Sequence, residues 1–407
     1  MADNNYKTDF IQGGVTAAAG FLAGTACAAI KKAGKRDVAV IYSLVQASAA
    51  GVFTLNRVKA APVLISMERL ASGQARAVVV NSGNANACNG EQGMSDALAM
   101  AAEAAGILNI PPDEVLVAST GVIGKKMPMD KVLPGIRTAA GQASTDGGPL
   151  AAQAIMTTDT FPKEAALNLE LGGKAVTIGG TAKGSGMIHP NMATLLCFIT
   201  TDAAVSPACL KKALRYAADL SFNMITVDGD SSTNDMAIIM ANGMAGNKMI
   251  DDEGSDYLYF RDALTAVCAS LAKDIARDGE GATRMIEVKV LNAASDGDAR
   301  LAARSIAGSN LVKAAVFGQD ANWGRVICAA GYSGAVFDPE KVDIFLGGVQ
   351  VARDGGSLEF SEEKALEALR KSTVTFTLDF KSGGCCATAW GCDLSYDYVK
   401  INADYRT

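Results

Sequence analysis

Short apolar runs that end in turns of small and polar residues are the feature of this sequence that most restricts its fold. VAVIYSLVQAS (38–48) and AVVVN (77–81) are rich in β-branched residues, which predicts buried strands. SGNANACNG (82–90) follows the second run and is dense in asparagine and glycine. The alanine-rich stretch after it, EQGMSDALAMAAEAAG, has the composition and spacing of a helix. This alternation predicts an α/β fold.

The same alternation continues to the end of the chain. PDEVLVASTGVIGK (112–125) predicts a strand that ends in a Ser-Thr-Gly turn, and STDGGP (144–149) predicts a surface loop. Ser206 and Pro207 have the residue types of a helix cap and a first helical position. Further strands are expected at MAIIMANG (236–243), RMIEVKVL (284–291), KVDIFLGGV (341–349) and TVTFTLDF (373–380), and further helices near 128–143, 256–277 and 361–371.

Length and charge exclude several classes of protein. The chain has 407 residues, of which 49% are hydrophobic, enough for two domains or one large two-layer unit. A net charge of −6 argues against nucleic acid as a partner, because phosphate binding needs a basic face. The apolar segment 15–30 is short for a membrane span, and its leader is acidic where a secretory leader is basic. A cytoplasmic protein without a membrane partner is expected.

The nine cysteines form an odd set without a C-x-x-C pair, which indicates reduced thiols. Most lie in apolar runs, as Cys197, Cys268 and Cys328 do. Cys385, Cys386 and Cys392 have spacings that do not fit the usual zinc pairs, and the chain has a single histidine. We therefore expect no metal site, and interpret these three cysteines as buried strand residues.

Common catalytic motifs are missing from the sequence. A Ser-His-Asp or Cys-His arrangement would have to use His189, and no G-x-S-x-G motif marks a serine. The glycines of GVIGKKM are too close together for a phosphate-binding P-loop. DGDSSTNDMAII, from Asp228, begins like a calcium loop but lacks its later glycine and glutamate, and we interpret it as a turn.

A nucleophile that needs no histidine is available in GSGMIHPNMATLLCFITTD (184–202). If the bond Ala193–Thr194 were cut, Thr194 would carry a free amine with a pKa of about 7.7–8.0, which can act as its own base. The Thr194 hydroxyl could make that cut by attacking the carbonyl of Ala193, giving an ester that water releases. Gly184, Gly186 and Pro190 would shape the loop. Met-Ala-Thr alone would favour a plain strand that begins at Thr194.

GSGMIHPNMATLL resembles the self-cleavage motif of the ornithine acetyltransferase family, the bifunctional glutamate N-acetyltransferases of arginine biosynthesis. Other blocks resemble that family in its order: KRDVAVIYSL, AAGVFTLNRVKAAPV, VVVNSGNANACNG, STGVIGK, TTDTFPK, DGDSSTND, DGEGATRMIEV, GQDANWGR and GCDLSYDYVKINADYRT. The resemblance implies a layered α/β (α+β) sandwich of the self-cleaving N-terminal-nucleophile type, related to the β-aminopeptidase-like fold. It also implies an α chain, 1–193, a β chain, 194–407, and an α2β2 heterotetramer.

The activity implied by the resemblance is acetyl transfer from N2-acetyl-L-ornithine to L-glutamate through an acetyl ester on Thr194. No cofactor is implied, and the sequence leaves open whether acetyl-CoA is a second donor. Two alternatives remain at this point. A self-cleaving amidase or aminopeptidase would pass the acyl group to water, and an uncleaved small-molecule binding protein would keep the bond Ala193–Thr194 intact.

Residue roles follow from the same resemblance. Thr120 and Gly121 match the oxyanion hole, although a turn that only needs these residue types is the alternative. The family's substrate contacts match Thr157, Lys183, Thr194, Glu280, Asn402 and Thr407. Of these, Lys183 suits a carboxylate and Glu280 an amine.

Four polar residues receive no catalytic role. For His189 we favour packing in the loop over a role as general base. Asp320, Asn322 and Arg325, in GQDANWGR, are expected only to hold a loop or an interface.

Overall fold

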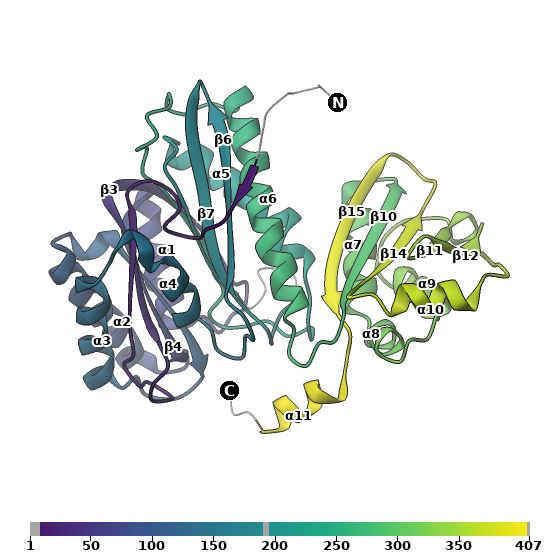
Figure 1. The fold of residues 1–407 in the computed structure, drawn as a ribbon, viewed down its shortest axis with the longest axis horizontal. Coiled ribbons are helices and arrows are strands. Elements are labelled where there is room, and N and C mark those ends of the chain that lie inside the picture. Colours follow the sequence, from purple (N-terminus) through teal and green to yellow (C-terminus); the bar gives the residue numbers. More distant parts are fainter. Residues whose placement is uncertain (1–8, 190–194, 405–407) are drawn as a thin grey trace.

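The structure is a computed structural model that describes residues 9–189 and 195–404 (Figure 1). Within these residues the strands form a nine-stranded sheet and a six-stranded sheet. The first contains β1 (Asp9–Ile11), β2 (Phe21–Ala26), β3 (Val38–Phe53), β4 (Gln74–Asn84), β5 (Val115–Val122), β6 (Lys163–Leu171), β7 (Lys174–Lys183), β8 (Leu196–Thr201) and β9 (Met236–Ala241). The second contains β10 (Met285–Ala293), β11 (Asp343–Leu346), β12 (Val349–Arg353), β13 (Gly356–Ser357), β14 (Thr373–Asp379) and β15 (Cys385–Cys392).

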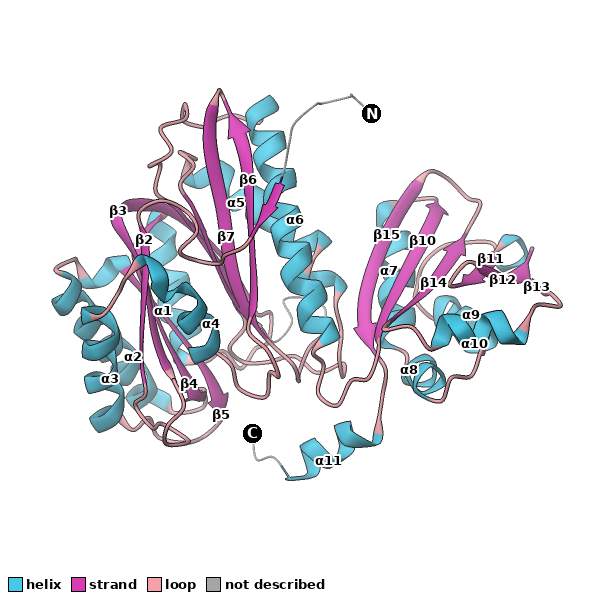
Figure 2. Cartoon of the chain, viewed as in Figure 1, coloured by secondary structure: helices cyan, strands magenta, loops and turns pink. Residues whose placement is uncertain are grey.

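The helices cover the outer faces of these sheets (Figure 2). Those beside the first sheet are α1 (Ala61–Arg69), α2 (Gly90–Leu108), α3 (Met129–Gly141), α4 (Gly148–Ala154), α5 (Pro207–Leu220) and α6 (Ser255–Arg277). The remainder are α7 (Asp296–Gly308), α8 (Asn310–Phe317), α9 (Trp323–Gly331), α10 (Glu362–Leu369) and α11 (Tyr396–Asp404). Ser206 caps α5 by accepting a hydrogen bond from the Cys209 amide, as predicted.

The long strand β3 joins two halves of the first sheet. Residues 38–42 pair with β4, residues 47 and 48 pair with it again after a shift in register, and residues 48–53 pair with β9 on the other side. The two halves face each other, because Val78 of β4 and Leu116 of β5 share one buried core with Phe198 of β8 and Ile238 of β9. The sheet therefore folds over an inner core.

Alternating side chains give the outer layers of this sandwich. Cys197 and Ile199 of β8 point away from the inner core and pack with α5 and α6. Val79 of β4 and Val117 of β5 pack with α2 and α3 on the opposite outer face. The result is a layered arrangement of helices, two sheet halves and helices, which confirms the predicted layered α/β fold.

The second sheet is attached to this sandwich through α6. Its strand β10, next to the edge strand β15, pairs parallel with β14 and antiparallel with β15. Buried residues of α6, β10 and α7 belong to one continuous core cluster. The C-terminal helix α11 follows β15 and lies below both sheets in the view of Figure 1, with no buried residue of its own.

The structure corrects several local predictions. The strand expected from Thr194 begins at Leu196, and Thr194 lies outside the described residues. The Ser-Thr-Gly segment belongs to β5 rather than to a turn. STDGGP (144–149) lies at the surface as predicted, with its other four residues exposed, but it forms a 3₁₀ turn that enters α4, and both of its glycines are buried. Among the cysteines expected to be buried, Cys328 and Cys386 are exposed and Cys385 is half-buried.

Among the described residues, no helix combines the length and the apolar character needed to span a membrane.

Candidate active site

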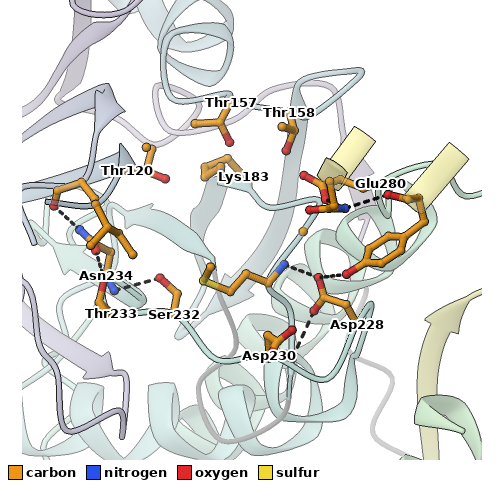
Figure 3. Close-up of a pocket in the computed structure, with 17 residues that line it drawn as sticks. Thr120, Thr157, Thr158, Lys183, Asp228, Asp230, Ser232, Thr233, Asn234 and Glu280 are labelled. Carbon is orange, nitrogen blue, oxygen red and sulfur yellow. Dashed lines mark hydrogen bonds between the residues drawn. The ribbon is translucent and has the colours of Figure 1, made fainter. Parts of the chain in front are cut away.

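A cavity of about 160 Å³ lies where the ends of β5 and β7 meet the loops before β9 and β10 (Figure 3). Its lining is Ala85, Thr120, Gly121, Ile123, Thr157, Thr158, Lys183, Gly186, Met187, Asp228, Asp230, Ser232, Thr233, Asn234, Glu280, Tyr398 and Asn402. Every described residue that the sequence predicted for the oxyanion hole or the substrate is in this set. The predicted Ala193, Thr194 and Thr407 lie outside the described residues.

Thr120 and Gly121 are held by the parallel pairing of β4 and β5. Gly121 pairs with Gly83 and has a φ of +134°, and a Cβ at this position would lie 2.3 Å from the Gly83 carbonyl carbon. Only glycine fits such a backbone. The Asn234 side-chain amide donates to the carbonyl oxygens of Ala85 and Ser119, at 2.6 and 2.8 Å. The predicted oxyanion segment is therefore fixed in place before any substrate arrives.

A buried charge cluster, Asp159, Lys163, Lys183 and Asp278, reaches the cavity through Lys183, which belongs to its lining. The Lys163 Nζ lies 2.8 Å from the Asp159 carboxylate and 2.6 Å from the Asp278 carboxylate, and these side chains are almost fully enclosed. The Lys183 Nζ is 3.9 Å from Asp159. Burial by itself raises the pKa of Asp159, but Lys183, Lys163 and their hydrogen bonds outweigh it and hold the pKa well below its usual range. The Asp159 carboxylate therefore stays ionised.

The buried charge cluster joins three segments of the site. Asp159 accepts hydrogen bonds from the backbone amides of Thr157 and Gly184, at 2.9 and 2.7 Å. Asp278 accepts from the Thr160 amide at 3.0 Å, and its carbonyl oxygen accepts from the Ser185 hydroxyl at 2.7 Å. Sequence reasoning identified Thr157 and Lys183 but missed the acidic residues that hold them.

We expect Lys163→Met to lower the free energy of unfolding by about 3–5 kcal/mol, because it leaves two buried carboxylates without their shared cation. Urea titration of the purified variant measures this change. Lys212→Met is the matched control, since the Lys212–Glu253 pair is about 60% exposed on both sides and its loss should change the free energy of unfolding little.

An equal decrease in the free energy of unfolding for both variants would contradict the role of Lys163.

The pH dependence of the free energy of unfolding is a second check. Because the folded pKa of Asp159 is depressed, its stabilisation is present above the unfolded value near 3.8 and is lost as the pH falls below it.

Asp228 fixes the loop that leads to the predicted cleavage bond. Its carboxylate accepts hydrogen bonds from the amides of Met187 and Ile188, at 2.6 and 2.9 Å, and from the Tyr398 hydroxyl at 3.3 Å. Gly186 lies so close to Glu280 that an added Cβ would be 2.4 Å from its carboxylate. Any larger residue at position 186 would displace one of the charges that line the cavity.

His189 is the last described residue before the predicted bond. It is half-buried, and burial followed by the charge of Arg304 lowers the pKa of its imidazole. Leu195, the first described residue after that bond, is buried, and its carbonyl oxygen accepts from the Met236 amide at 3.1 Å. Backbone hydrogen bonds therefore hold Ile188 on one side of the predicted cleavage bond and Leu195 on the other, while the packing role favoured for His189 stays a prediction.

Charges of opposite sign lie on different sides of the cavity. Figure 3 shows Lys183 next to Thr157, with Glu280 and Asp228 on the other side. Glu280 is held by the Asn402 side-chain amide, which donates to its carboxylate at 2.9 Å. An ammonium group facing carboxylates matches the zwitterion of an amino acid.

The segment 228–234, interpreted from sequence as a turn, supplies five lining residues that sequence reasoning missed.

The remaining polar candidates lie outside the cavity. Asn322 caps α9 by accepting from the Arg325 amide and donates to Asp320 at 3.1 Å. The Arg325 guanidinium donates to the Leu311 carbonyl oxygen at 2.9 Å. These contacts confirm that the three residues hold a loop. In the described part of the chain, no three His, Cys, Asp or Glu side chains are grouped to hold a metal ion.

Comparison with known proteins gives close relatives over the whole chain. The ArgJ family model matches residues 22–407. Proteins named arginine biosynthesis bifunctional protein ArgJ are 62% identical over 401 residues in Symbiobacterium thermophilum and 53% identical over 403 residues in Caldanaerobacter subterraneus subsp. tengcongensis. In both cases the match covers 98% of this chain and 100% of the relative.

Solved structures with sequence similarity match about half of the chain. The Bacillus halodurans arginine biosynthesis bifunctional protein argJ is 47% identical, with a TM-score of 0.49, over 51% of this chain and 97% of that one. The Mycobacterium tuberculosis ornithine acetyltransferase complexed with ornithine is 40% identical, with a TM-score of 0.42, over 46% of this chain and 100% of that one.

Proposed function

The chain belongs to the ArgJ family, and from this premise we propose that it transfers an acetyl group from N2-acetyl-L-ornithine to L-glutamate through an ester on Thr194. It is an enzyme of arginine biosynthesis, as the names of its relatives state for them. The observation that carries the proposal is the cavity, where Thr120, Gly121, Lys183 and Glu280 meet although they are far apart in sequence.

The proposed substrate position follows from the charges of the cavity. Lys183 would bind a carboxylate of the amino acid, and Glu280, oriented by Asn402, would bind an amine. Thr157, whose amide is held by Asp159, would add a further contact near Lys183. Both carboxyl-bearing substrates could then place the reacting nitrogen at the same point. A reaction in two half-steps through one ester requires that the reacting nitrogens of both substrates reach this same position.

In the first proposed half-reaction, the Thr194 amine takes the proton of the Thr194 hydroxyl, and the oxygen attacks the acetyl carbon. The hydroxyl of Thr120 and the N–H of Gly121 would stabilise the resulting oxyanion. The carbon–nitrogen bond then breaks, and the leaving ornithine amine takes the proton. In the second half-reaction the glutamate amine attacks the ester carbon, and the proton it loses returns to the Thr194 oxygen.

Formation of the nucleophile is proposed to divide the chain into residues 1–193 and 194–407. Lys183 of β7 pairs with Leu196 of β8, so the bond would be cut between two neighbouring strands of one sheet. The ladder between β7 and β8 would then hold the two pieces together after the cut. An α2β2 assembly of these pieces in the cytoplasm completes the proposal.

A product assay tests the acceptor. Purified protein with N-acetylornithine and glutamate should release equal amounts of ornithine and N-acetylglutamate, measured by liquid chromatography and mass spectrometry. Without glutamate, ornithine release should stop near one equivalent per site, because the ester has no acceptor. Acetate in either reaction would identify an amidase, and no product from either would leave only a binding protein.

A further inference from the structure

A buried carboxyl group next to Leu195 has no task in the reaction proposed above. Asp235 lies between the loop 228–234 and β9, and it is only 1% exposed. It does not belong to the lining of the cavity, so it is not placed to touch a substrate there. One of its carboxylate oxygens, Oδ2, accepts no hydrogen bond from any described residue. Buried polar atoms almost always have a partner, so this oxygen asks for one.

Asp235 is next to Leu195 because the strands that follow them run side by side. Leu196 of β8 pairs in parallel with Met236 of β9, and the Met236 amide donates to the Leu195 carbonyl oxygen at 3.1 Å. The Leu195 amide in turn donates a hydrogen bond to the Asp235 carboxylate. Three covalent bonds join the nitrogens of Thr194 and Leu195, which keeps these atoms within about 3.7 Å of each other. A carboxylate that holds the second nitrogen is therefore within reach of the first.

Another aspartate of the site already holds two successive nitrogens in this way. The two carboxylate oxygens of Asp228 accept hydrogen bonds from the amides of Met187 and Ile188, one each, at 2.6 and 2.9 Å. At Asp235 the Leu195 amide is bound and one oxygen is left over. The arrangement at Asp228 thus shows how the remaining oxygen can hold the nitrogen that precedes Leu195 in the chain.

The surroundings of Asp235 suit a carboxyl group that faces a cation. Burial raises the pKa of Asp235 well above its usual range, and the hydrogen bond from the Ser232 hydroxyl, the charge of Lys183 and the amide hydrogen bonds offset this only in part. An ammonium group within hydrogen-bond distance would stabilise the ionised form further. A free amine on the neighbouring residue would supply such a group.

We propose that Asp235 is a positioning residue that holds the free amine of Thr194 through its second carboxylate oxygen. The inference rests on the proposed function, because the amine exists only after the bond Ala193–Thr194 is cut. By accepting one N–H, Asp235 turns the nitrogen lone pair toward the Thr194 hydroxyl, whose proton the amine takes in the first half-reaction. Asp235 also stabilises the ammonium group that results. It acts through Thr194 and exchanges no atom with the substrate.

Asp235→Asn tests this role, because asparagine keeps the shape and an acceptor oxygen for the Leu195 amide but removes the charge. The variant should still be cut, since the attacking hydroxyl is unchanged. Its kcat for exchange between N-acetylornithine and glutamate should fall about 10- to 100-fold, because the amine loses its orientation. KM for N-acetylornithine should stay nearly unchanged, since Asp235 does not line the cavity. Steady-state rates on protein that mass spectrometry shows to be cut measure both quantities.

The pH profile separates positioning from a mere loss of structure. The acidic limb of kcat/KM reports the pKa of the amine, and a carboxylate beside an ammonium group raises that pKa. Removing the carboxylate should therefore move the limb to lower pH by about one unit or more. The other charged groups nearby, Lys183 on β7 and Asp228 and Asp230 in the preceding loop, are the same in both proteins. The adjoining ends of β3 and β8 are uncharged, at Thr54 and Leu195.

Asp202→Asn is the matched control. Asp202 is also buried and accepts hydrogen bonds from two backbone amides, those of Ala19 and Thr177, at 3.1 and 2.8 Å, but it follows the far end of β8. This variant should keep both kcat and the position of the limb. Asp235→Ser also lacks the charge and should shift the limb as Asp235→Asn does, so the test does not depend on the folding of one variant.

An unmoved limb in the Asp235 variants would overturn the proposal, whether or not kcat falls, because a structural defect changes the rate alone. The same shift in Asp202→Asn would overturn it as well. A folded Asp235→Asn variant that stays whole would place Asp235 in the cut rather than at the amine, and so contradict the assignment. A failure of the proposed function looks different, because the wild-type protein would then be uncut or would form no N-acetylglutamate.

Discussion

Thr194→Ala is expected to leave the chain uncut and to lower acetyl transfer by on the order of 10⁴-fold or more, because one hydroxyl is proposed to serve both reactions. Alanine has no oxygen to attack the Ala193 carbonyl and none to carry the acetyl group. An intact mass spectrum under denaturing conditions checks the first effect. Dividing 41.9 kDa in proportion to 193 and 214 residues gives wild-type pieces of roughly 20 and 22 kDa.

Thr194→Ser is the matched control, because serine keeps the hydroxyl and loses only a methyl group. It should show some of both pieces and some transfer. Under native conditions the wild-type pieces should stay together, since β7 and β8 pair across the cut. An uncut wild-type chain that transfers acetyl groups, or an active Thr194→Ala variant, would remove the basis of the proposed mechanism.

The elements that the sequence predicted well are those with strong local signals. The β-branched run at 77–81 lies inside β4, and the alanine-rich stretch after SGNANACNG forms α2. Ser206 and Pro207 mark the start of α5, where the cap depends on residues three positions apart. Such patterns are decided within a few residues, so a single sequence is enough to recognise them.

Features that depend on distant pairing could not be predicted. The first sheet folds over its inner core because β3 pairs with β4 along one part of its length and with β9 along another. No residue type within β3 indicates where its partner changes. STDGGP has the composition of a surface turn, yet Gly147 is buried against Ala23, where an added Cβ would lie 1.8 Å from the carbonyl oxygen. Close approach of two backbones, rather than a turn, explains that glycine.

The candidate site also combines residues that the sequence indicates with residues that only the three-dimensional structure brings together. Thr120, Lys183 and Glu280 were assigned by resemblance, and the structure places them around one cavity. Lys163 and Asp278 are 115 positions apart, so their ion pair becomes visible only in three dimensions. The sequence of the loop 228–234 resembles only the beginning of a calcium loop, and this incomplete pattern does not indicate that the loop lines the cavity.

Thr120→Ala is expected to lower kcat for acetyl transfer by about 10²–10³-fold while leaving KM for N-acetylornithine nearly unchanged. The proposed role of the Thr120 hydroxyl is to donate to the oxyanion, which exists only after the attack on the acetyl carbon. Gly121 would still donate its N–H, because its place opposite Gly83 depends on the backbone of β4 and β5. Steady-state rates on protein that mass spectrometry shows to be cleaved measure the effect.

Thr120→Ser separates the hydroxyl from the shape of the side chain. It keeps the donor, so its kcat should stay within about tenfold of the wild type. A Thr120→Ala variant with unchanged kcat would show that the Ser-Thr-Gly segment is only a strand end. A variant in which KM rises while kcat stays constant would instead place the hydroxyl on the bound substrate, since only a contact formed in the transition state lowers kcat alone.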